Sequence, residues 1–246
     1  MAMFSTVVYG SEGDQRANHA TQQHALGTEM HFRDGRKFRY CKNGAVAAVR
    51  GNLYQSAVLG ADYDELAVPT ARAIGATTVT LTLGSTAVTA NQFAEGYLSV
   101  EDDAGEGYLY EIESNEVAAA SGTLTLVLRD PRGLQVAWTT ATTVSVQANP
   151  FGAVIIHPSP PTTTLVGVAQ YDLTASYFGW FQYKGLATVL TEGTLVVGKE
   201  AMPSTSTDGA VAPYGAGGGD TDEIHIGQVR EVAATTEYSL VMLNLA

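Results

Sequence analysis

Short runs in which apolar residues alternate with threonine or other polar residues dominate the middle of this chain. The run ATTVTLTL at 76–83 places its valine and leucines on one side, and GTLTLVLRD at 122–130 does the same with three leucines. A period of two is the pattern of a β-strand with one buried face. Turn-prone residues separate such runs at the spacing typical of β-sandwiches and barrels. We therefore predict an all-β fold with sandwich-like or barrel-like lobes, an extended N-terminal arm and few or no helices.

Apolar rhythm divides the chain into three predicted segments. Residues 1–27 have little such rhythm, and we predict an extended arm or a short helix that ends before Gly27. Residues 28–158 form a predicted β-rich domain, in which Asp34-Gly35 and Asn43-Gly44 mark tight turns. No repeat of fixed period is visible in the sequence.

The third predicted segment, residues 159–246, is a small β-barrel-like domain. The sequence HPSPP at 157–161 introduces it, and its three prolines cannot extend a central strand, so we expect a linker or crossing there. A Gly-, Ser- and Thr-rich stretch at 203–222 is predicted to be a long mobile or partner-binding loop rather than a strand.

Charge is low in amount and uneven in distribution. Charged residues make up 15% of the chain, and the formal net charge is −12. An excess of negative charge repels phosphate, so we expect no nucleic-acid partner. Residues 1–50 are the exception, with seven basic and four acidic residues. This basic segment could dock on an acidic partner surface, or it could be local variation in charge. The candidate contact residues are Arg16, Arg33, Arg36, Lys37 and Arg39.

The compartment is indicated by cysteine usage and hydropathy. Cys41 is the only cysteine, so no disulfide can form within the chain. The first residues lack the basic-then-apolar pattern of a signal peptide, and no stretch approaches the length of a membrane span. We therefore expect a protein that is made in the cytoplasm, with no membrane partner.

The last third of the chain carries a recognisable order of small-residue strands and turns. The order is Gly167-Val-Ala, Thr174-Ala175, an aromatic strand that ends in Lys184-Gly185-Leu-Ala, a hairpin at Gly193 and Leu195, a Gly-rich loop, Ile226-Gly227-Gln-Val, and the final strand SLVMLNL. This order resembles the small β-barrel of phage capsid decoration proteins, also called cement or head-stabilising proteins. The likeness is weaker upstream, where a large β insertion departs from the family pattern.

The resemblance implies a virion structural protein on the outer surface of a phage capsid. Its partners would be the major capsid protein and further copies of itself, as a homotrimer. A repetitive shell offers many equal sites, which small symmetric oligomers suit, and several weak contacts per oligomer combine through effective concentration. The family pattern is a fold pattern, so it supplies no set of contact residues.

The sequence contains no catalytic, cofactor-binding or metal-binding constellation that we can identify. The five histidines lack the spacing of a zinc site, and none of the acidic clusters matches a calcium loop. A calcium ion that bridges subunits through such a cluster is a minority hypothesis. Cys41 lies among basic residues that could lower its pKa, although a buried strand cysteine is the simpler interpretation. We predict no enzyme activity and no cofactor.

Two alternatives remain open from the sequence. The first is another virion component: a major capsid protein should have a long spine helix, and a fibre should have repeats, and neither is visible. The second is a carbohydrate-binding or hydrolytic β module, for which stacking surfaces could be provided by Trp138, Trp180, Phe181 and Tyr183.

Overall fold

The computed structural model describes residues 7–58, 60–215 and 224–245, and it is almost entirely β-structure. The chain forms two compact units. Unit 1 consists of residues 1–58 and 150–246, and unit 2 consists of residues 59–149. The all-β prediction is confirmed, since the described helices are two short 3₁₀ turns, Asp14–Arg16 and Ala61–Tyr63.

This division differs from the predicted one. The boundaries lie at Val58/Leu59 and Asn149/Pro150, whereas the sequence predicts them at 27/28 and 158/159. The proline-rich segment at 157–161 lies inside unit 1, and the imidazole of His157 is fully buried there. The prolines correctly predict that 157–161 contains no strand. A break in the strand pattern does not, however, by itself mark a domain boundary.

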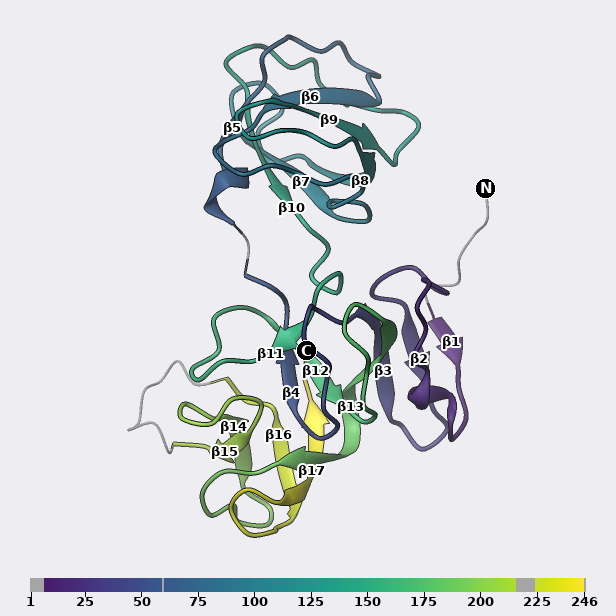
Figure 1. Cartoon of the computed structure of the whole chain (residues 1–246), viewed down its shortest axis with the longest axis vertical. Helices are drawn as coiled ribbons and strands as arrows, with labels where there is room; N and C mark the ends of the chain where they lie inside the picture. Colours follow the sequence, from purple (N-terminus) through teal and green to yellow (C-terminus); the bar gives the residue numbers. More distant parts are fainter. Residues whose placement is uncertain (1–6, 59, 216–223, 246) are drawn as a thin grey trace. The chain divides into compact units, whose positions relative to one another are not determined.

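Unit 1 contains one eleven-stranded sheet (Figure 1). Its main path runs β1-β2-β3-β13-β17-β16-β14-β15; β12 pairs with β13 and β4, and β4 pairs with β11. The strands are β1 (Val7–Tyr9), β2 (Glu29–His31), β3 (Lys37–Lys42), β4 (Leu53–Gln55), β11 (Ile155–Ile156), β12 (Leu165–Ala169), β13 (Phe178–Leu190), β14 (Glu200–Pro203), β15 (Val211–Pro213), β16 (Gly227–Glu231) and β17 (Tyr238–Asn244).

The 13-residue strand β13 organises unit 1. Its first half pairs with β3, and its second half pairs with β17 over the whole length of that strand. Three clusters of buried side chains flank the sheet, and the largest joins β13 to β17 through Val189, Val241 and Leu243. Strand β15 lies within the stretch predicted to be a loop, so that prediction was wrong for Val211–Pro213, while residues 216–223 lie outside the described residues.

Unit 2 is a six-stranded sheet in the order β5-β10-β7-β8-β9-β6 (Figure 1). Its edge strands β5 and β6 contact each other, so the sheet is nearly closed into a barrel. The strands are β5 (Leu66–Ala67), β6 (Thr78–Thr82), β7 (Tyr97–Asp102), β8 (Leu109–Asn115), β9 (Thr123–Leu128) and β10 (Thr143–Gln147). The alternating valines and leucines of β6 and β9 are buried in the single core of the barrel, as their pattern predicts.

Unit 2 consists of two similar halves, β5-β6-β7 and β8-β9-β10. Strand β6 pairs with β9 so that Thr80 lies opposite Thr125, the residue at the matching position of TVTLT and TLTLV. Strand β7 pairs with β10 in the same way, with Ser99 opposite Ser145 in the matching triplets LSV and VSV. Each of these pairings is therefore centred on an approximate twofold axis.

The remaining pairings obey the same symmetry. Leu66 of β5 lies opposite Val144 of β10, and Tyr110 of β8 lies opposite Leu98, which matches Val144 in β7. This duplication is not evident in the sequence, because the two halves have the same alternation of polar and apolar residues but few identical residues.

Candidate docking surface

The outward face of β13 and β17 is apolar although it is exposed. Alternation buries every second residue of β17 and of the second half of β13, from Lys184 to Leu190, and turns the residues between them outward. On that face Leu186 lies opposite Met242, and Leu190 lies opposite Tyr238. The exposed fractions are 40% for Leu186, 47% for Met242 and 48% for Tyr238. Contiguous apolar residues on a sheet face are the usual mark of a contact surface.

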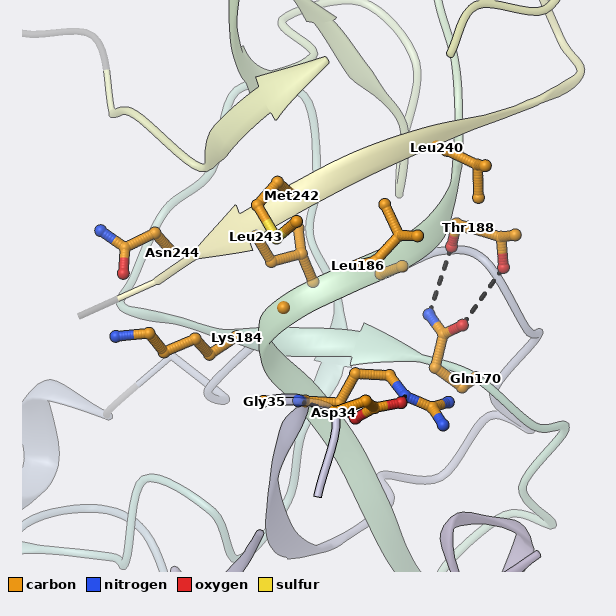
Figure 2. Close-up of a pocket in the computed structure, with 13 residues that line it drawn as sticks. Asp34, Gly35, Gln170, Lys184, Leu186, Thr188, Leu240, Met242, Leu243 and Asn244 are labelled. Carbon is orange, nitrogen blue, oxygen red and sulfur yellow. Dashed lines mark hydrogen bonds and ion pairs between the residues drawn. The ribbon is translucent and has the colours of Figure 1, made fainter. Parts of the chain in front are cut away.

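This face is the floor of an open groove with a volume of about 780 Å³ (Figure 2). Figure 2 shows Leu186 and Met242 on adjacent strands, with Lys184 and Asn244 at one end of the groove and Gln170 and Thr188 at the other. Gln170 donates to the Thr188 carbonyl at 3.2 Å and accepts from the Thr188 hydroxyl at 3.2 Å. An apolar floor with a polar rim is the composition of a protein–protein contact.

The tip of the β2–β3 hairpin forms one side of the groove. Its turn at Asp34-Gly35 follows the sequence prediction, and the backbone N–H of Phe32 closes it by donating to the Arg36 carbonyl at 2.9 Å. Arg36 lies directly over Gly185, where an added Cβ would come within 2.8 Å of the Arg36 Cα. Gly185 also has a φ of +88°, a conformation that glycine adopts without strain. The hairpin can therefore lie against β13 only because residue 185 has no side chain.

The lysine at one end of this groove has a second lysine as its partner on the neighbouring strand. Lys184 on β13 is the cross-strand partner of Lys37 on β3, and Lys184 is exposed while Lys37 is half-buried. Among the described residues neither ammonium group has a carboxylate partner. Like charges directly opposite one another destabilise a strand pair. The pair is therefore an uncompensated positive site beside an apolar floor.

The other predicted contact residues have different surroundings. Arg36 pairs with Glu12 at 2.6 Å and with Asp34 at 2.7 Å, and Arg16 also reaches Glu12, at 3.5 Å. Burial works to lower the pKa of Arg36, but the hydrogen bonds to the two carboxylates outweigh it and raise that pKa. These two arginines are therefore largely compensated within the chain.

Arg39 belongs to an internal cluster rather than to a free surface. Its guanidinium lies over the Tyr183 ring at 4.5 Å and the Phe151 ring at 5.3 Å, and 3.9 Å from Glu29. Burial works to raise the pKa of Glu29, but hydrogen bonds from His31 and Tyr183 and the charge of Arg39 lower it overall. Arg33, by contrast, is exposed on the hairpin turn. Of the predicted contact residues, Arg36 lines the groove and Lys37 lies next to it on β3, whereas Lys184 was not predicted.

The N-terminal segment lies on its own unit over the described residues 7–27. Strand β1 pairs with β2, and the backbone of His19 exchanges two hydrogen bonds with Phe178 of β13. His24 packs against Tyr40 and Trp180, with ring centroids 5.1 and 5.4 Å away. Over this range the predicted arm therefore lies on the sheet of its own unit.

Cys41 and the two tryptophans, which could have a catalytic or ligand-binding role judged from the sequence, are buried. Cys41 is fully buried, and burial raises the pKa of its thiol. Both tryptophans are buried, so neither offers a stacking surface. Within residues 7–58, 60–215 and 224–245, no three His, Cys, Asp or Glu side chains are grouped to hold a metal ion.

In the same described part of the chain, no helix has the length and hydropathy to cross a membrane. No protein-family model, no curated protein and no solved structure matches this chain.

Proposed function

We propose that this protein is a virion structural protein, which binds the outer surface of a phage capsid and stabilises it as an oligomeric decoration protein. The observation that carries the proposal is the exposed apolar face of β13 and β17. This face belongs to the segment, residues 167–246, whose strand order resembles capsid decoration proteins. A cement function requires a surface of this kind, since it must exclude water against another protein at many equal sites.

The other candidates receive less support. The four aromatic side chains proposed for carbohydrate stacking are all buried, Trp138 in the core of unit 2 and Trp180, Phe181 and Tyr183 in the cores of unit 1. A long spine helix, which a major capsid protein should have, does not occur among the described residues.

A binding experiment tests the proposal. Shells assembled from the capsid protein of the same virus, without this protein, are mixed with the purified full-length chain and sedimented. We expect saturable co-sedimentation and a higher temperature of shell disruption, together with a trimeric native mass by light scattering. Failure to bind such shells would refute the proposed function.

A further inference from the structure

We propose that the groove over β13 and β17 is the site at which the protein binds the capsid shell, and that the shell presents there an apolar ridge next to a carboxylate. This inference rests on the proposed function and adds the contact surface and the chemistry of its partner.

The shape and composition of the groove indicate the apolar ridge on the partner. Leu186, Leu240 and Met242 form a floor between the β2–β3 hairpin and the β16 side of the sheet. A recessed apolar floor accepts a protruding apolar side chain and gains free energy as both surfaces leave water. Two copies of one recessed floor do not fill each other, so a second copy would have to bind through some other surface.

The lysine pair indicates the carboxylate on the partner. Lys184 lines the groove and has Lys37 as its cross-strand partner, and neither has a carboxylate partner among the described residues. A carboxylate from the partner would meet this positive charge and form hydrogen bonds with charged donors. Complementary charge beside an apolar floor also fixes the orientation in which the partner docks.

The distribution of charge between the two units supports contact through unit 1. Unit 2 contains three arginines, no lysine and twelve acidic residues, a formal net charge of −9, whereas unit 1 contains ten basic and thirteen acidic residues, a net charge of −3. Arg129 in unit 2 is already paired with Glu111 and Glu113. Burying unit 2 against protein would remove many uncompensated carboxylates from water, which is costly. The nearly neutral unit 1 is therefore the favourable unit to bury.

The experiment measures shell affinity for the full-length protein and its variants. Met242→Glu places a negative charge on the floor, and we expect affinity to fall at least about 30-fold, as for the loss of an interface hot spot. Lys184→Gln should weaken binding several-fold and reduce its dependence on salt. The matched control is Leu109→Glu, which changes an exposed leucine of unit 2 and should leave affinity within about twofold. Thermal unfolding checks that each variant is folded, and Met242→Gln replaces Met242→Glu if the latter is not.

The outcomes separate the inference from the proposed function. If the wild type binds shells and folded Met242 variants bind equally well, the groove is not the contact and the inference fails while the function stands. If the wild type does not bind, the function itself fails. If the Met242 variants lower the native mass but leave shell affinity unchanged, the groove binds a second copy and the inference is overturned.

Discussion

Gly185 shows how one residue determines the shape of the groove. It lies where β13 changes its partner from β3 to β17, and its left-handed φ coincides with a close approach of the Arg36 backbone. Gly35, at the tip of the same hairpin, has an equal φ of +88° but no atom near the position of a Cβ. A side chain at position 35 would therefore meet backbone strain alone, whereas a side chain at position 185 would meet both backbone strain and a steric clash.

Substitution of these glycines should have unequal effects. Gly35→Ala carries the left-handed strain alone, about 1–2 kcal/mol. Gly185→Ala carries similar strain and also displaces the hairpin, which adds about 1–3 kcal/mol by analogy with overpacking. Urea unfolding of both variants measures the difference. Equal losses of stability would show that the hairpin does not depend on contact with residue 185.

His24 should make unit 1 sensitive to mild acid. Burial among aromatic rings, with a smaller contribution from nearby His19, lowers the pKa of His24. In the unfolded chain His24 becomes protonated near pH 6.5, whereas in the folded protein it becomes protonated only at lower pH. The stability contributed by His24 is therefore complete above pH 6.5 and is lost as pH falls below it. Thermal unfolding at pH 7.5 and 5.5 should show a smaller loss in His24→Gln than in the wild type, and an equal loss would contradict this assignment.

At the scale of strands, the sequence predicts which face of a strand is buried but not which strands meet. The alternation in 122–130 correctly assigned Leu124, Leu126 and Leu128 to the core, because period-two burial is a local property. The groove could not be predicted in this way, since it joins the hairpin at 34–36 to β13 and β17. The lysine pair is equally non-local, because it depends on the register between β3 and β13.

The twofold arrangement of unit 2 predicts equal roles for matching core residues. Leu81 and Leu126 occupy matching positions in β6 and β9, and both are fully buried. Leu81→Ala and Leu126→Ala should each destabilise unit 2 by about 2–5 kcal/mol, the usual cost of a cavity in a core. Leu109→Ala, on the exposed side of β8, should change stability by less than about 0.5 kcal/mol. A large difference between the two core variants in urea unfolding would show that the halves are not energetically equivalent.

At the scale of the whole molecule, unit 2 has a core and a sheet of its own. The buried residues of its core lie between Leu66 and Val146, and its named strands pair only with one another. Sequence composition did not reveal this organisation, since strands of the same kind occur on both sides of each boundary. The chain returns to unit 1 at Asn149/Pro150, and no linker-like composition marks that boundary.

The isolated segment 59–149 should therefore fold by itself. Its closed core does not require unit 1, and a chain of this size can bury enough surface to be stable. We expect dispersed amide resonances and a cooperative thermal transition from this fragment. A fragment without cooperative unfolding would show that unit 2 depends on the rest of the chain.

The point of insertion has a consequence for how such a gene can change. Gln55 of β4 and Ile155 of β11 are cross-strand neighbours, so the whole of unit 2 is spliced into what would otherwise be a simple hairpin connection. A hairpin tolerates exchange of its connection as long as the two strand ends remain adjacent. Recombination at this one locus could thus delete the barrel, add a further copy of one of its three-stranded halves, or replace it with another domain. In each case unit 1 would retain its sheet. The same locus is a natural position for displaying a cargo domain by genetic fusion.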